Sequence, residues 1–196
     1  MHVIRNWSLI LYERRKQLLD VVPNAGHLGV ADLERDFNVT VVTQNVDNLH
    51  ERAGSTHVIH LHGELTKVCS SRDPYNPHFV KELAPEEYEV KLGDKAGDGT
   101  QLRPFIVWFG ESVPEIETAI RYVEQADIFV IIGTSLNVYP AAGLLNYVPR
   151  AAEVYLIDPK PVDTHVMRPI HVIQKGASEG VKELKALLTV TQPPLP

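Results

Sequence analysis

The feature that most constrains the fold is an alternation of short, continuous apolar runs with longer stretches of helical periodicity. The runs "VTVVT" (39–43), "IFVII" (128–132) and "VYLI" (154–157) are typical of strands buried on both faces. Between such runs, as in "PEIETAIRYVEQA" (114–126), apolar residues recur every three or four positions, which indicates amphipathic helices. Strands that alternate with helices predict a parallel α/β sheet flanked by helices.

The other predicted elements continue this alternation. Asn24, which follows Pro23, is a plausible N-cap and predicts the start of a helix. The further helices are expected at 8–22, 24–37 and 179–188, and the further strands at 58–61, 105–109 and 171–173.

The stretch 64–104 breaks the pattern, because it is polar, rich in glycine and proline, and weakly periodic. Such a stretch is usually a functional insertion or a small subdomain, and a surface loop is the alternative. We therefore expect residues 1–63 and 104–196 to form the sheet domain and residues 64–103 to form a small inserted module.

Composition limits the class of protein. The chain has 196 residues, 44% apolar and 22% charged, which is ordinary for a globular domain with one substantial core. A net charge of -6 gives no support to binding of nucleic acid. No apolar run approaches the roughly 18 residues that span a bilayer, and "MHVIRNW" lacks the design of a signal peptide. With Cys69 as the single cysteine, no internal disulfide can form, and we expect a cytoplasmic protein without a membrane partner.

Small or hydrogen-bonding residues follow each predicted inner strand. The segments are "QNVD", "GTSLN", "DPKP" and "KGAS". Ligands of open α/β sheets bind outside the carboxyl ends of the strands, so four such ends predict one nucleotide-sized cleft. The alternative is that loops between strands and helices are polar in any case.

Five strings, in order, resemble the sirtuins, the NAD-dependent protein lysine deacylases: "TQNVDNLHERAG", "LHGEL", "RPFIVWFGE", "GTSLNVYPAAGL" and "IDPKP". The resemblance extends from about Tyr12 to the last helix and is strongest to the bacterial desuccinylase-type subgroup. It implies a Rossmann-like fold, NAD as cofactor, acylated lysine side chains of proteins as substrates, and nicotinamide and O-acyl-ADP-ribose as products. An inactive remnant that binds ADP-ribose or a partner protein is an alternative, and an unrelated nucleotide-binding domain is another.

The resemblance implies that His62, in "LHGEL", is the general base, with Asn45 and Asp47 completing the catalytic set. Imidazole has a reference pKa of about 6.5 and can accept a proton near neutral pH. The alternative is a structural histidine, since the chain has nine. Asn45 and Asp47 would otherwise cap the helix that begins with "DNLHERA".

The resemblance also assigns the cofactor contacts. Amides and carboxylates can hold the carboxamide and hydroxyl groups of NAD, while glycine lets backbone approach phosphate closely. The nicotinamide and ribose contacts are Gln44, Asn45 and Asp47, and the phosphate and adenosine contacts are Gly133, Thr134, Ser135, Asp158, Gly176 and Ala177.

For the protein substrate, the resemblance implies two extended segments that clamp the acyl-lysine peptide by strand addition. These segments are Phe109, Gly110, Glu111 and Asn137, Val138, Tyr139, and Val107 lines the acyl-lysine tunnel. Tyr12 and Arg15 stand three apart on a predicted helix and so share one face. In the desuccinylase-type subgroup such a pair selects acidic acyl groups. The alternative is a solvated basic face.

The chain departs from the family in two places. Most sirtuins hold a structural zinc with two Cys-x-x-Cys pairs, whereas this chain offers "VCSS" and "KLGDKAGDGTQ" there. A zinc site needs four ligands, so we expect no metal. The Gly-rich diphosphate loop near the start of sirtuins is also missing, because of either a start codon assigned too far downstream or a true truncation; we expect weak NAD binding without it.

Overall fold

The structure is a computed structural model that describes residues 22–84, 89–133, 141–161 and 168–191. The chain divides into two compact units. Residues Thr43–Asn48 and His60–Pro114 belong to the first unit, and Pro23–Val42, Leu49–Ile59 and the chain from Glu115 onward belong to the second. The predicted limits of the inserted module, 64–103, stay a prediction. Within the described residues no helix is long and apolar enough to cross a membrane.

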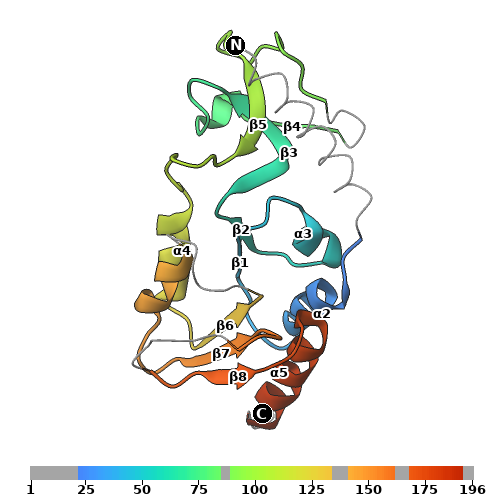
Figure 1. Cartoon of the computed structure of the whole chain (residues 1–196), viewed down its shortest axis with the longest axis vertical. Coiled ribbons are helices and arrows are strands. Elements are labelled where there is room, and N and C mark those ends of the chain that lie inside the picture. Colours follow the sequence, from blue (N-terminus) through green and yellow to red (C-terminus); the bar gives the residue numbers. More distant parts are fainter. Residues whose placement is uncertain (1–21, 85–88, 134–140, 162–167, 192–196) are drawn as a thin grey trace. The chain divides into compact units, whose positions relative to one another are not determined.

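The second unit is built on a parallel sheet of three strands in the order β6-β7-β8, which lie side by side in Figure 1. The strands are β6 (Ile128–Ile132), β7 (Glu153–Ile157) and β8 (His171–Ile173). Ile128 pairs with Glu153 and Tyr155 pairs with His171, so all three strands end at one edge of the sheet. The central strand β7 is buried from Val154 to Ile157, as its continuous apolar run predicts.

Helices α2 (Ala25–Leu33) and α5 (Ala177–Thr191) pack on each other and complete this core. Val30 and Leu33 from α2, with Val181 and Leu184 from α5, belong to the same buried cluster as the inner residues of β7. Asn24 caps α2 as predicted, because its Oδ1 accepts the Gly26 amide at 2.9 Å. The described residues of this unit also form the helix α4 (Ile116–Val123), the 3-10 helix η2 (Ala141–Tyr147) and the short helix α3 (Leu49–Ala53).

The first unit contains an antiparallel sheet in the order β4-β3-β5. The strands are β3 (Gly63–Ser70), β4 (Lys81–Glu82) and β5 (Leu102–Ile106), and the 3-10 helix η1 (Pro77–Phe79) lies between β3 and β4 in the sequence. The stretch that reads as irregular in the sequence therefore begins with an eight-residue strand. The pairing of β3 with β5 shifts register between Glu64 and Val68, which interrupts the period-two pattern of a regular strand.

Strands β1 (Val41–Thr43) and β2 (Val58–His60) form a two-stranded pair. Two backbone bonds join them, from the Val41 amide to the His57 carbonyl and from the Leu61 amide to the Thr43 carbonyl, each 2.9 Å. Residue numbers rise together along both strands, so they run parallel.

The structure corrects three sequence predictions. The strand predicted at 105–109 begins earlier, at Leu102, and ends at Ile106. The run 39–43 is not buried on both faces, since Val41 and Val42 are half-buried, and in β6 only Ile131 is fully buried. The helix predicted at 24–37 ends at Leu33. The helix predicted at 8–22 lies outside the described residues except for Val22.

Candidate functional site

His62 lies in the tight turn between β2 and β3 and is half-buried. Its Nδ1 is 3.1 Å from the carbonyl oxygen of Gln44, which directly follows β1. A carbonyl can only accept, so this hydrogen bond requires the proton on Nδ1 and leaves Nε2 unprotonated in the neutral ring. The local fold therefore selects the tautomer of His62 in which Nε2 can accept a proton.

The backbone around His62 is held from both sides. The Val107 amide, just after β5, donates to the His62 carbonyl at 2.9 Å. Gly63 has a φ of +76°, and a Cβ at this position would collide with the carbonyl oxygen of Phe105. Only glycine meets both conditions without strain, so the "HG" of the motif is required by the turn itself.

The three polar residues after β1 lie in the same unit as His62. Gln44 and Asp47 are half-buried and Asn45 is exposed. The Asn45 amide donates to the Thr43 hydroxyl at 3.1 Å, and the Asn45 carbonyl is 3.1 Å from Nδ1 of His60. The structure thus brings "QNVD" and "LHG" together, as their positions at the ends of β1 and β2 predict.

His60 is a residue that the sequence analysis did not single out. Its side chain is buried, and its ring holds the backbone of the polar segment through the Asn45 carbonyl. A histidine that occupies an otherwise apolar strand, two positions before His62, is the signal that could have identified it.

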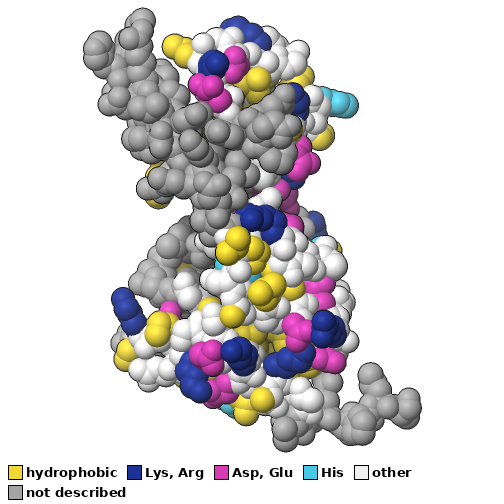
Figure 2. Space-filling model, turned by 90° about the vertical axis from the view of Figure 1, so that its right-hand side faces the viewer, with side chains coloured by type: hydrophobic (Ala, Val, Ile, Leu, Met, Phe, Trp, Pro, Cys, Tyr) yellow, Lys and Arg dark blue, Asp and Glu magenta, His cyan; other side chains and the backbone are white. Residues whose placement is uncertain are grey.

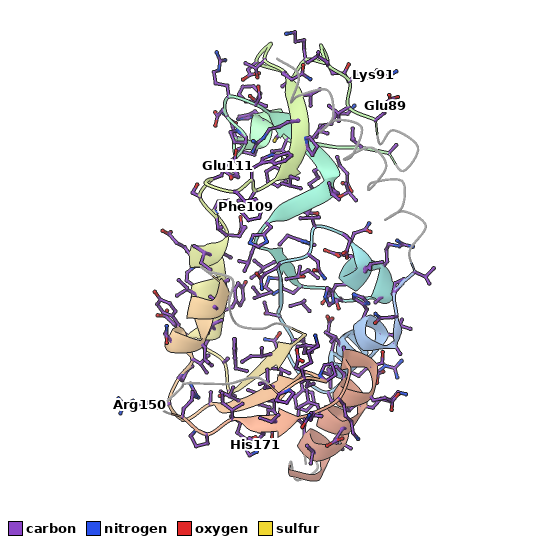
Figure 3. The ribbon with its side chains drawn as sticks, viewed as in Figure 1. Glu89, Lys91, Phe109, Glu111, Arg150 and His171 are labelled. Carbon is purple, nitrogen blue, oxygen red and sulfur yellow. The ribbon has the colours of Figure 1, made fainter. Side chains whose placement is uncertain are left out.

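The segment after β5 carries Phe109, Gly110 and Glu111, and Figure 3 shows Phe109 and Glu111 on this segment. The Phe109 side chain is fully exposed, whereas Val107 is half-buried. The Glu111 carboxylate accepts hydrogen bonds from both terminal nitrogens of Arg103, at 2.6 and 2.9 Å. This hydrogen-bonded pair lowers the pKa of Glu111 and raises that of Arg103.

Within the second unit, the carboxyl ends of the three parallel strands bring the predicted adenosine-side residues to one edge. Gly133 follows β6, and its amide donates to the Ile157 carbonyl at 3.0 Å. Asp158 follows β7, and its carboxylate accepts the Lys160 amide at 2.8 Å. Gly176 and Ala177 stand at the start of α5, after β8. This edge is where open α/β sheets bind ligands.

Seven predicted site residues lie outside the described part of the chain, so their roles stay predictions. They are Tyr12, Arg15, Thr134, Ser135, Asn137, Val138 and Tyr139.

The region that we expect to correspond to the zinc module of sirtuins contains Cys69, which lies in β3. Cys69 has no exposed surface, and burial raises the pKa of its thiol, which disfavours the thiolate that a metal requires. No group of three or more potential metal ligands occurs among the described residues. The residues present therefore do not fit a structural zinc, although the absence of metal stays a prediction.

Comparison with known proteins identifies the family. The Sir2 family model matches residues 3–140. An NAD-dependent protein deacylase of Bacteroides thetaiotaomicron is 83% identical over 175 residues, which cover 89% of this chain and 75% of that protein. An NAD-dependent protein deacylase of Helicobacter pylori is 46% identical over 172 residues, covering 88% of this chain and 72% of that protein.

Solved structures agree in fold. A Sir2 homologue in complex with NAD superimposes with a TM-score of 0.76 at 35% identity, covering 92% of this chain and 70% of that chain. A mutant Sir2 homologue in complex with 2'-O-acetyl ADP ribose gives a TM-score of 0.79 at 33% identity, covering 96% and 76%. The predicted family, Rossmann-like fold class and use of NAD are thereby confirmed. On these grounds, together with the polar ends of β1 and β2, the chain belongs to the Sir2 family.

Proposed function

We propose that this chain is an NAD-dependent protein lysine deacylase with His62 as its general base. In the overall reaction, acyl-lysine, NAD and water give free lysine, nicotinamide and O-acyl-ADP-ribose. NAD is consumed as a substrate and supplies the ADP-ribosyl group that receives the acyl chain. The observation that carries the assignment to His62 is its Nδ1 contact with the Gln44 carbonyl, which leaves Nε2 to accept a proton.

The polar residues after β1 would bind the nicotinamide and ribose end of NAD. Gln44, Asn45 and Asp47 offer amide and carboxylate groups, and their backbone is fixed by the bonds of Asn45 to Thr43 and His60. The adenosine and phosphate end would be bound by the residues that follow β6, β7 and β8. These are Gly133, Thr134, Ser135, Asp158, Gly176 and Ala177.

The protein substrate would bind by strand addition to Phe109–Glu111 and to Asn137–Tyr139, with Val107 lining the lysine tunnel. One similar structure is described as a Sir2–p53 peptide–NAD+ complex, at a TM-score of 0.71 and 27% identity over 89% of this chain and 74% of that chain. The net charge is -6, and on the face in Figure 2 acidic and basic side chains are interspersed rather than gathered by sign. Both features favour protein over nucleic acid as substrate. We also assign the enzyme to the cytoplasm.

The acyl preference would depend on Tyr12 and Arg15. A succinyl or malonyl tail ends in a carboxylate, whose unpaired burial is costly, and Arg15 can donate a two-pronged hydrogen bond to it. We expect Arg15→Met to lower kcat/KM for succinyl-lysine peptide, with a loss of transition-state binding on the order of 2 kcal/mol. The effect on acetyl-lysine peptide should be much smaller. Equal losses on both peptides would show that Arg15 does not select the acyl group.

The test of the function is nicotinamide release from NAD with acylated peptide, measured on the wild type, His62→Ala and His78→Ala. His78 is an exposed histidine of the same unit, in η1, and serves as the matched control. We expect His62→Ala to abolish release while circular dichroism and ADP-ribose binding stay near wild type. Near-normal turnover of His62→Ala would refute the assignment. ADP-ribose binding without any release by the wild type would favour the inactive-remnant alternative.

A further inference from the structure

The segment Trp108–Ser112, which directly follows Val107, is tied down by side chains from elsewhere in the first unit. Arg103 donates from Nη1 and Nη2 to the two carboxylate oxygens of Glu111, at 2.6 and 2.9 Å. The same carboxylate accepts the Trp108 amide at 3.0 Å. The hydroxyl of Tyr75 donates to the carbonyl of Ser112 at 3.1 Å. Both ends of the segment are therefore anchored.

The middle of the segment has a defined conformation that leaves the side chain of Phe109 exposed to solvent. The Glu111 amide donates to the Trp108 carbonyl at 3.0 Å, which closes a turn, and Gly110 adopts a φ of +90° within it. Phe109, inside this turn, contributes a fully exposed side chain. An aromatic side chain held in solvent by a fixed turn is an anchor available to a partner.

Arg103 is well suited to hold this segment. It lies on β5 opposite Cys69 of β3, so its backbone is part of the sheet. Its side chain is 18% exposed, against 31% for Lys67 in the Lys67–Glu64 pair of the same unit. Partial burial and two-pronged geometry make such a pair stronger and more directional than an exposed single contact. The Tyr75 ring also packs edge-on against Phe105, with centroids 6.3 Å apart.

We propose that Arg103 and Tyr75 are positioning residues that preorganise the segment Trp108–Ser112 for the acylated peptide. This inference rests on the proposed function, in which the segment binds substrate by strand addition. Strand addition depends on backbone groups, and a segment already ordered loses less conformational entropy when the peptide binds. Neither residue needs to touch the substrate.

The two positioning residues should affect substrate binding more than the chemical step. His62 has separate supports, since its Nδ1 contacts the Gln44 carbonyl and its own carbonyl accepts the Val107 amide. Arg103 also contacts the chain just before Val107, since its Nη2 donates a long hydrogen bond of 3.4 Å to the Ile106 carbonyl, but Ile106 is held independently by its pairing with Gly63 in the sheet. Releasing the segment therefore leaves the base in place while the peptide-binding backbone becomes mobile.

The kinetic test compares Arg103→Met, Arg103→Lys and Tyr75→Phe with the wild type. We expect Arg103→Met to raise KM for acyl peptide by about tenfold with kcat changed by less than about threefold. Arg103→Lys keeps the charge but loses the two-pronged hydrogen bond, so its KM should lie between those of the wild type and Arg103→Met. Tyr75→Phe keeps the ring but loses one hydrogen bond and should raise KM by about threefold. The control is Arg72→Met, since Arg72 has a 70% exposed side chain and a single 3.4 Å contact with Asp98. Unchanged KM in both Arg103→Met and Tyr75→Phe would overturn the proposal. An increase in KM in Arg72→Met as large as that in Arg103→Met would also overturn it.

A second readout is independent of activity. The chain has two tryptophans, so a Trp7→Phe background leaves Trp108, the first residue of the segment, as the only one. Acrylamide quenching of Trp108 should increase in Arg103→Met and not in Arg72→Met, while circular dichroism stays unchanged. Unaltered quenching in a folded Arg103→Met variant would refute the positioning role. A wild type without deacylase activity would refute the proposed function, yet the quenching comparison would still decide whether Arg103 orders the segment.

Discussion

The most direct test of the first unit's architecture is Ser70→Ala. Ser70 ends β3, is completely buried, and its hydroxyl donates to the Asp98 carboxylate at 2.7 Å. The same oxygen accepts the amides of Arg72 and Asp73, each at 3.1 Å. The hydroxyl thus joins the end of β3 to Asp98 through its hydrogen, and its oxygen holds the turn that follows β3 by accepting the amides of Arg72 and Asp73.

The expected cost follows from the groups that lose a partner. Alanine leaves two backbone amides without their acceptor and removes a donor from the carboxylate of Asp98. An unsatisfied buried polar group costs about 1–3 kcal/mol, and the exposed positions of Arg72 and Asp73 let water compensate in part. We therefore expect a loss of about 2–4 kcal/mol in the free energy of unfolding. For a chain of this size that corresponds to a decrease in Tm of about 5–15 °C.

The assay is thermal unfolding of the full chain by circular dichroism at pH 7, with Ser71→Ala as the matched control. Ser71 is the exposed neighbour, and its backbone bond to Gln101 survives the substitution. The control should stay within about 0.5 kcal/mol of the wild type. If Ser70→Ala melts at the same temperature as Ser71→Ala, the hydroxyl does not hold the unit together.

Three further outcomes follow from the same region. The pKa of Asp98 is lowered from 3.8 to about 2, chiefly by hydrogen bonds from Thr100 and Ser70, so its ionised form stabilises the fold above pH 3.8 and this contribution disappears as the pH falls toward 2. The difference in Tm between the wild type and Asp98→Asn should therefore be full near pH 5 and shrink on acidification; a constant difference would contradict this. A chelator should leave Tm unchanged and elemental analysis should find no stoichiometric zinc, whereas one zinc per chain would overturn the prediction. Gly63→Ala should destabilise the unit by more than about 2 kcal/mol, because of the positive φ and the Phe105 carbonyl, and a Tm equal to that of the wild type would refute the strain argument.

The elements predicted correctly are those with local signals. The Asn24 cap is a short-range hydrogen bond, and the runs at 128–132 and 154–157 contain enough apolar residues to specify strands without knowledge of their neighbours. The motifs around His62 likewise place it at a strand end, where the structure finds it in contact with Gln44.

The errors arise where pairing partners decide the structure. β3 escapes prediction because its register shift between Glu64 and Val68 breaks the alternation of inward and outward residues. The start of β5 is not predicted because proline usually interrupts a strand, and Pro104 lies within β5. However, β5 is an edge strand of its sheet, where a missing backbone amide is tolerated. The sequence could not identify Arg103 as a positioning residue, since its proposed role depends on a two-pronged hydrogen bond to Glu111 that forms only in the folded turn.

The polar cluster around Ser70 gives a physical reason to expect folding without a metal. By the resemblance to sirtuins, we expect "VCSS" and "KLGDKAGDGTQ" to stand where zinc-bearing members carry their two cysteine pairs. A structural zinc in that place joins two chain segments that are distant in sequence. Here Ser70 from the first segment bonds to Asp98 from the second, and Asp98 also accepts the Thr100 amide at 3.0 Å and its hydroxyl at 2.7 Å. Ser70 pairs with Leu102 and Cys69 pairs with Arg103, so the end of β3 that the cluster holds also lies next to the arginine that binds Glu111. Loosening the cluster by Ser70→Ala should therefore also increase the mobility of Trp108, although neither Ser70 nor Asp98 touches the segment Trp108–Ser112 in the contacts described above.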